Sequence, residues 1–271
     1  MNTNLPKLKI GWFYPKYLNL YGDRGNVEIL VARAKLRNIP VEVIEIDLDT
    51  KLDAAFFKEI NLVFMGGGPD LDQQKIYLDF LENKGNHLME FLNNFGVGLF
   101  ICGSYQLLGK YYKDAYEKIL EGLGFLDFYT ESPSSSEKTK SKSRMIGNII
   151  VEVNSLLLNE PVFRSHNKLG NTFVGFENHG GRTYLSKDLI PLGLTKKNQG
   201  NNDLDLTEGV FYKNTFGTYL HGPLLARNPH FADYLIAKSI KIESLPHSAE
   251  LEKFDTSVIV SAHEKSKKLK R

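Results

Sequence analysis

The chain has 271 residues, of which 42% are hydrophobic and 24% are charged, a composition typical of a folded globular protein and not of a disordered, collagen-like or coiled-coil chain. Lys and Arg together number 34 and Asp and Glu 32, so the formal charge of +2 gives no electrostatic case for nucleic acid as the main partner. The longest apolar runs, at 62–65 and 97–102, are far shorter than the ~20 residues of a membrane span. The N-terminal residues do not read as a signal peptide, so we expect a cytoplasmic protein. The single cysteine excludes an internal disulfide and a zinc site built from several thiolates, and no metal site is expected.

The first half of the chain alternates strand-like and helix-like segments. The run VEVIEI has the period of two of a strand, and two other runs are continuously apolar, as in parallel strands buried on both faces. The helical segments place apolar residues three and four positions apart. The predicted elements are, in chain order, a strand at 7–14, a loop at 17–26, a helix at 27–37, strands at 41–46 and 62–65, a helix at 77–94, a strand at 97–101 and a helix at 106–112. This alternation predicts an α/β fold with a mostly parallel central sheet and helices on both faces.

The second half is less regular. Residues 131–143 (ESPSSSEKTKSKS) are rich in Ser and Lys and predict a mobile surface loop. Strand-like sequence resumes at 146–153. Short strands are expected at 172–176, 209–212 and 215–220, as antiparallel additions to the sheet, and a closing helix at 231–240. We therefore predict one domain over 1–245 and a polar, basic tail over 246–271 that is frayed from 263 onward.

Cys102 stands where a predicted buried strand meets a predicted helix, and Gly103 follows it. The first turn of a helix leaves backbone N–H groups unpaired and favours a thiolate. Gly103 permits a tight turn that exposes the sulfur, and its amide could bind a developing oxyanion. On this turn alone, a buried and inert cysteine is the more common reading.

Two further segments favour a nucleophile. Three glycines at 66–68 end the preceding parallel strand, so their amides are expected at the same sheet edge as Cys102. His221, in YLHGP, lies just past an apolar strand, where its imidazole could pair with the thiol.

In this order along the chain, the glycines, Cys102 with Gln106 four residues later, and His221 resemble the class I glutamine amidotransferases, in the CobB/CobQ-like branch near the cobyric acid synthases. The resemblance covers about residues 8–240. It is closest to the glutaminase subunits that supply ammonia for the amidation of lipid II. It is carried by the segments YLNLYGDRGN (17–26), FMGGGPDLDQ (64–73), ICGSYQLLGKYY (101–112), EGLGFLDFYTES (121–132), GFENHGGRTYL (175–185) and GTYLHGPLLARN (217–228).

The resemblance implies a flavodoxin-like amidotransferase domain that hydrolyses L-glutamine. It implies Cys102 as nucleophile, His221 as base, the amides of Gly67 and Gly103 as oxyanion donors, and Arg144 as a clamp for the glutamine carboxylate. Gln106 is expected to be structural or substrate-facing. The implied partner is a Mur-ligase-like synthetase subunit of the MurT type, in a heterodimer. No G-x-x-x-x-G-K-[ST] run occurs in this sequence, so no cofactor is expected in this chain, and ATP and Mg²⁺ are expected on the partner.

The chain also departs from the class pattern. Phe100 and Ser104 stand where the class has glycines on either side of the nucleophile, and Pro223 replaces the usual Glu two residues after the histidine. Another carboxylate must then orient the imidazole, or a Cys–His dyad works alone. Asp23 is the first candidate, although it could simply cap the helix that follows it.

Glu177 is the second candidate for the missing carboxylate, and the neighbouring His179 is interpreted as structural. Two alternative functions stay open: an ammonia-supplying amidotransferase of another pathway, such as corrinoid amidation, and a non-catalytic binding subunit.

Overall fold

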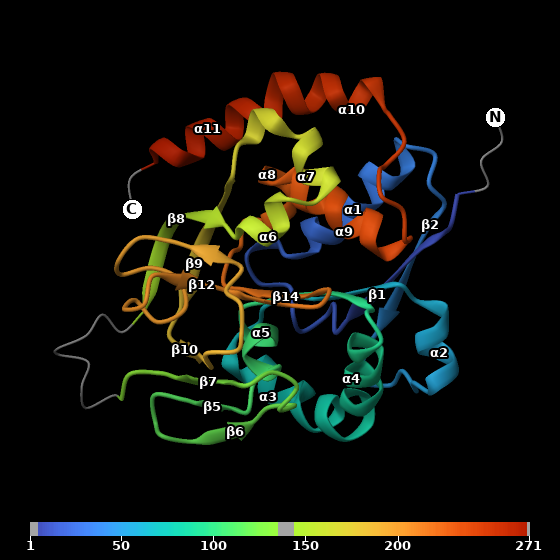
Figure 1. The fold of residues 1–271 in the computed structure, drawn as a ribbon. Coiled ribbons are helices and arrows are strands. Elements are labelled where there is room, and N and C mark those ends of the chain that lie inside the picture. The colour runs from blue at the N-terminus through green and yellow to red at the C-terminus, as the bar shows by residue number, and fades with distance from the viewer. Residues whose placement is uncertain (1–4, 135–143, 270–271) are drawn as a thin grey trace.

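The computed structural model describes residues 5–134 and 144–269. Its centre is a six-stranded sheet with the order β2-β1-β3-β4-β14-β13 (Figure 1). The strands from β2 to β14 pair in parallel, and the edge strand β13 is antiparallel, which is a flavodoxin-like order and confirms the predicted fold class. The strands are β1 (Leu8–Phe13), β2 (Val41–Ile46), β3 (Leu62–Met65), β4 (Val97–Ile101), β13 (Val210–Tyr212) and β14 (Thr215–Thr218).

Helices cover both faces of this sheet (Figure 1). One face carries α1 (Arg24–Lys35), α8 (Leu224–Arg227) and α9 (Pro229–Ser239). The other carries α2 (Ala54–Glu59), α3 (Asp70–Leu78), α4 (Gly85–Asn93) and α5 (Gly103–Leu107), with a π-helical segment, η2 (Asp79–Lys84), joining α3 to α4. The predicted helix at 77–94 is confirmed and begins earlier in the chain.

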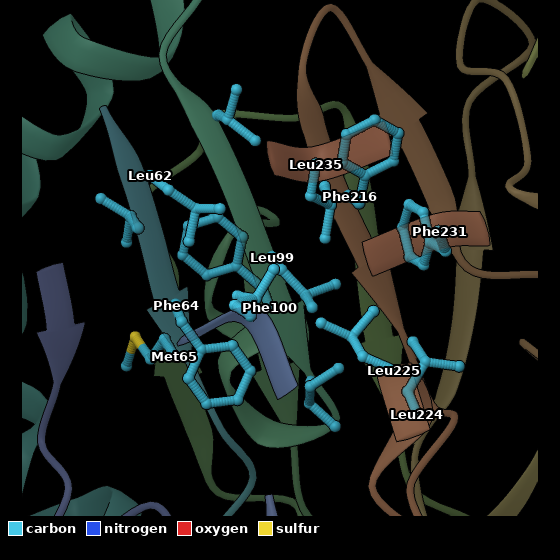
Figure 2. Packing of buried hydrophobic residues seen from close by; sticks show 14 of the residues in the cluster. Leu62, Phe64, Met65, Leu99, Phe100, Phe216, Leu224, Leu225, Phe231 and Leu235 are labelled. Atoms are coloured by element: carbon cyan, nitrogen blue, oxygen red, sulfur yellow. The ribbon is translucent and has the colours of Figure 1, made fainter. Parts of the chain in front are cut away.

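The core covers both faces of the central sheet, and one part of it lies between the central strands and α8 and α9. Strands β3 and β4 are buried on both faces, which explains why their sequences are continuously apolar. Figure 2 shows side chains of these strands next to those of β14 and the two helices. The labelled members are Leu62, Phe64, Met65, Leu99, Phe100, Phe216, Leu224, Leu225, Phe231 and Leu235.

Two smaller four-stranded sheets flank the central sheet, with the orders β10-β7-β5-β6 and β12-β11-β8-β9. Their strands are β5 (Tyr111–Lys113), β6 (Ile119–Glu121), β7 (Phe128–Glu131), β8 (Met145–Val153), β9 (Thr172–His179), β10 (Arg182–Leu185), β11 (Gly193–Leu194) and β12 (Thr207–Glu208). Four short helices lie outside these layers and before the end of the chain: η1 (Leu20–Gly22), α6 (Ser155–Leu158), α7 (Pro161–Ser165) and η3 (Asn167–Leu169).

Three details of the predicted secondary structure are wrong. The strand expected at 215–220 pairs in parallel with β4, and the one expected at 172–176 belongs to a separate sheet. The helix expected at 106–112 ends at Leu107, and Tyr111–Lys113 instead form strand β5, which pairs with β6 and β7. Periodicity identifies a strand or helix but not its partners. Of the predicted mobile loop, 135–143 lie outside the described residues.

The end of the chain forms helices, so the expected fraying of 263–268 is wrong. Segments α10 (Ala249–Phe254), η4 (Asp255–Ile259) and α11 (Val260–Lys268) run along the outer side of α7 and α9 (Figure 1). Buried Arg33 of α1 donates to both carboxylate oxygens of Asp255, at 2.8 and 2.9 Å, and to Asp233 of α9. Buried His263 of α11 bonds through Nδ1 to Arg227 O at 2.9 Å. The polar composition of this segment therefore did not reveal that some of its polar side chains are buried and hold it to the domain. The domain boundary at 245 stays a prediction.

Candidate active site

The carboxyl ends of the parallel strands bring the predicted residues together. Asp23 ends the loop after β1, Gly67 follows β3, Cys102 follows β4, and His221 follows β14, at the edge where open α/β sheets bind ligands. Gly67 lies among the other three. A Cβ on this glycine would lie 2.9 Å from His221 Cε1, 3.1 Å from Cys102 Cβ and 3.4 Å from Asp23 Oδ2, so a side chain here would disrupt the site.

Cys102 occupies a strained turn between β4 and α5. Its backbone has φ 54° and ψ −108°, a sparsely populated conformation of the kind found at active sites. Ser104 holds the turn: Ile101 N–H donates to its Oγ at 2.9 Å, and its hydroxyl donates to Met65 O at 2.7 Å. Phe100 points into the core (Figure 2). The chain thus makes the predicted sharp turn without the glycines usual in the class.

His221 is buried and held by its backbone. Its N–H donates to Phe176 O at 2.8 Å, and its O accepts from Phe176 N–H at 3.1 Å. Nδ1 lies 3.1 Å from Asp23 Oδ1, while Nε2 has no hydrogen-bond partner within the described residues. Burial lowers the pKa of His221, but Asp23 and Cys102 raise it more, to about 10. The imidazolium is therefore stabilised beside the thiol.

Asp23 contacts the imidazole and does not cap the following helix. Although it stands at the N-cap position of α1, its side chain makes no capping bond. Its Oδ1 faces His221, and its Oδ2 accepts from Gly67 N–H at 2.7 Å. The side chain is fully buried. The structure therefore places the first-choice carboxylate where an orienting acid is needed.

Glu177 and His179 are paired with other groups. Glu177 Oε2 accepts from Gly200 N–H at 2.9 Å and lies 3.7 Å from His179 Nε2. His179 Nδ1 is bonded to Gly181 O at 2.9 Å, and its ring stacks on Tyr219 at 3.6 Å between centroids. Burial lowers the pKa of His179. These contacts are those of a packed, structural histidine.

One of the two backbone amides that were expected to bind the oxyanion, that of Gly67, is already hydrogen-bonded. The amide of Gly67 already donates to Asp23, so in this structure it is not free to bind an oxyanion. The amides of Gly68 and Gly103 have no acceptor among the described residues. These two groups, together with the amide of Gly67 if Asp23 released it, are the candidate oxyanion donors.

Arg144 and Gln106 have different environments. Arg144 is exposed at the start of β8 and donates to Asn178 Oδ1 and to Asn178 O, each at 2.9 Å. Gln106 is buried and donates to Tyr219 Oη at 3.1 Å. The contact of Gln106 favours its structural interpretation, and the clamp role of Arg144 stays a prediction.

Sequence reasoning missed two residues near the site. The ring of Tyr21 meets the ring of His221 edge to face, with centroids 5.0 Å apart, and its hydroxyl accepts from Asn178 Nδ2. Gln73 is buried against Gly68 and Gly103. Both stand in segments that carry the family resemblance, which was the available signal, but no periodicity or spacing distinguishes them from loop and helix-surface residues.

A family model described as a CobB/CobQ-like glutamine amidotransferase domain matches residues 9–229. The chain belongs to this family. It is 41% identical over 240 residues to the lipid II isoglutaminyl synthase (glutamine-hydrolyzing) subunit GatD of Staphylococcus aureus (strain N315), covering 89% of this chain and 87% of that protein. It is 37% identical over 236 residues to the subunit of the same name from Streptococcus pneumoniae (strain ATCC BAA-255 / R6), covering 87% and 81%. The resemblance drawn from the sequence is confirmed.

The fold agrees with solved structures at low sequence identity. A chain of PurLQS from Thermotoga maritima superposes with a TM-score of 0.54 at 19% identity, covering 88% of this chain and 96% of that chain. This likeness shows a shared fold. Within the described residues, none of the helices has the length and apolar character needed to cross a membrane.

Proposed function

We propose that this chain is the glutamine-hydrolysing subunit of a lipid II isoglutaminyl synthase. The observation that carries the proposal is the buried contact of Asp23 with His221 beside Cys102, in a chain 41% identical to a subunit of that name. A thiol paired with an oriented imidazole is the arrangement that nucleophilic catalysis on a carboxamide requires. A chain that only bound a partner would not need the strained backbone of Cys102.

In the proposed reaction, His221 accepts the thiol proton through Nε2 and the Cys102 sulfur attacks the carboxamide carbon of glutamine. The C–N bond then breaks as His221 returns the proton to the leaving nitrogen, so ammonia departs and a glutamyl thioester remains. Water attacks the thioester while His221 takes its proton. Glutamate leaves, and the thiol is restored by that proton. Asp23 keeps the imidazole in one orientation and stabilises its charged form.

The ammonia needs an acceptor that another chain activates. We propose a Mur-ligase-like synthetase subunit of the MurT type, which would bind ATP and Mg²⁺ and activate the α-carboxylate of D-isoglutamate in lipid II. The names of the two relatives, each a subunit of a lipid II isoglutaminyl synthase, support a partner of this kind. We further propose a heterodimer located in the cytoplasm, where ATP is available.

Co-expression with the Mur-ligase-like protein tests this proposal. We expect the two chains to co-purify, and the complex with ATP, Mg²⁺ and glutamine to amidate lipid II, as read by mass spectrometry. Glutamine hydrolysis with ATP consumption but no change in lipid II would point to another acceptor, such as a corrinoid carboxylate. No hydrolysis in either the isolated chain or the complex would leave only the binding-subunit alternative.

Replacing Arg144 with alanine is expected to raise KM for glutamine more than it lowers kcat. A carboxylate clamp away from the scissile amide contributes mainly uniform binding. Loss of a charge-assisted pair would cost about 1.5–3 kcal/mol, which corresponds to a KM increase of roughly 10-fold to 150-fold. Steady-state kinetics of Arg144→Ala, with exposed Arg164→Ala of α7 as the matched control, check this. An unchanged KM would assign Arg144 to holding Asn178 alone.

A further inference from the structure

Gln73 is a buried polar residue on an otherwise solvent-facing part of α3. Its side chain is only 5% exposed, whereas Leu71 and Gln74 on the same helix are exposed. Burying a carboxamide is costly unless it makes hydrogen bonds. The mechanism above uses no group on this helix, so the position of Gln73 needs a separate explanation.

The carboxamide of Gln73 lies between two backbone segments of the active site. Its Nε2 donates to Gly68 O at 2.9 Å. On the other side it packs against the backbone of Gly103, because a Cβ built on that glycine would lie 2.3 Å from Gln73 Nε2 and 2.5 Å from its Cδ. Gln73 therefore joins the loop after β3 to the residue that follows the nucleophile.

The hydrogen bonds of the glycine loop show which way each peptide faces. Gly67 N–H donates to Asp23 and Gly67 O accepts from Leu20 N–H, so both groups of this residue face the loop that follows β1. Gly68 O instead accepts from Gln73. The C=O of Gly67 and the N–H of Gly68 belong to the same trans peptide group, in which these two bonds point in opposite directions. The amide of Gly68 thus faces the side of Gln73 and Gly103.

We propose that Gln73 is a positioning residue that holds Gly68 against Gly103, so that their two amides converge on the oxyanion formed at Cys102. This inference rests on the proposed glutaminase function. Gln73 does not contact the substrate itself in this proposal but sets the position of the backbone amides that do. The amide of Gly67 stays bonded to Asp23 and keeps that carboxylate in place for His221. The amide of Gly67 then helps to orient the base through Asp23, and the amide of the next residue, Gly68, stabilises the oxyanion.

The role predicts an effect on kcat rather than on KM. An oxyanion develops only on the way to the tetrahedral intermediate, so donors aimed at it stabilise the transition state and not bound glutamine. Removing a single oxyanion donor costs about 10²–10³ in kcat, and misplacing donors through Gln73 should cost about 10-fold to 100-fold. Alkylation of Cys102 by iodoacetamide displaces iodide at a saturated carbon and forms no such oxyanion.

The test compares Gln73→Leu with Gln74→Leu, a matched control at the adjacent, exposed position, in the full chain alone and with the synthetase subunit. We expect kcat of Gln73→Leu to fall about 10-fold to 100-fold, with KM and the rate of iodoacetamide alkylation close to wild type. The only cysteine of the chain is Cys102, so alkylation reports this thiol alone. A kcat equal to that of the control, or an alkylation rate that falls with kcat, would overturn the inference.

A double-mutant cycle adds a second, independent test. Gly103→Ala places a methyl group against Gln73 and should lower kcat, but in Gln73→Ala/Gly103→Ala that space is vacant. We expect the double variant to match Gln73→Ala, whereas fully additive losses would mean that the two residues act separately. Absence of hydrolysis by the wild-type chain, alone and with the subunit, would instead overturn the proposed function.

Discussion

Cys102→Ala is expected to abolish glutamine hydrolysis, lowering kcat by about four orders of magnitude or more, while the protein stays folded. The chain has no other cysteine, and no other group at this sheet edge can form the thioester. The fold should tolerate the change because the side chain is small and the neighbouring turn is held by Ser104 and not by the thiol. Cys102→Ser should be nearly as inactive, since a hydroxyl is a much weaker nucleophile at neutral pH.

Glutamate release and a thermal melt of the same sample check this prediction. A glutamine-like electrophile such as a diazo-oxo-norleucine should label Cys102 in the wild type and fail to label Cys102→Ala. Turnover above background in the alanine variant, at wild-type thermal stability, would refute the nucleophile assignment. Labelling at any other residue would count against it equally.

Asp23→Asn is expected to lower kcat by about 10²–10⁴, as for other orienting carboxylates. Both partners of Asp23 present N–H groups: Gly67 N–H donates to Oδ2, and His221 Nδ1 faces Oδ1. An asparagine has only one oxygen, so its NH₂ group must face one of these donors. If the asparagine oxygen accepts from Gly67 N–H, its NH₂ group faces His221 Nδ1. The imidazole then favours the tautomer with its proton on Nε2, and a protonated Nε2 cannot accept the thiol proton.

The same substitution should change the pH dependence. Burial lowers the pKa of His221, and Asp23 is the first of the groups that raise it, to about 10. The pKa of His221 is thus above the ~6.5 of an unfolded chain, so its protonation stabilises the fold at low pH, and this stabilisation is lost as pH rises towards 10. In Asp23→Asn the pKa should fall and this loss should shift to lower pH.

The measurements for Asp23→Asn are kcat against pH and chemical denaturation between pH 6 and 10. The matched control is Asp49→Asn, an exposed aspartate in the loop after the neighbouring strand β2. Near-wild-type turnover in Asp23→Asn would mean that Cys102 and His221 work as a dyad and that the contact in the structure is not needed for catalysis.

Much of the fold could be predicted because its signals are local. Continuous apolar runs at β3 and β4 identified buried parallel strands. A cysteine directly after one of them favoured a nucleophile turn only together with the glycines at 66–68 and with His221. The helices at the end of the chain could not be predicted. These helices are held to the domain by the ion pair of Asp255 with Arg33, which is 222 residues away in the sequence. Composition does not indicate a contact between such distant residues.

By itself, the sequence indicated the sheet edge and the thiol, because strand periodicity shows where a residue leaves the sheet and only Cys102 offers a thiolate. The choice of His221 over His179 came from the family resemblance. The sequence did not determine which carboxylate serves His221, and it assigned the oxyanion role to Gly67. The tertiary structure decided both points. Asp23 is hydrogen-bonded to Gly67, 44 residues away in the sequence, and to His221, 198 residues away. Because this carboxylate accepts the hydrogen bond of the Gly67 amide, that amide is not free to bind the oxyanion. The physical reason is that a hydrogen bond depends on distance and direction in space, and neither is encoded in the spacing along the chain.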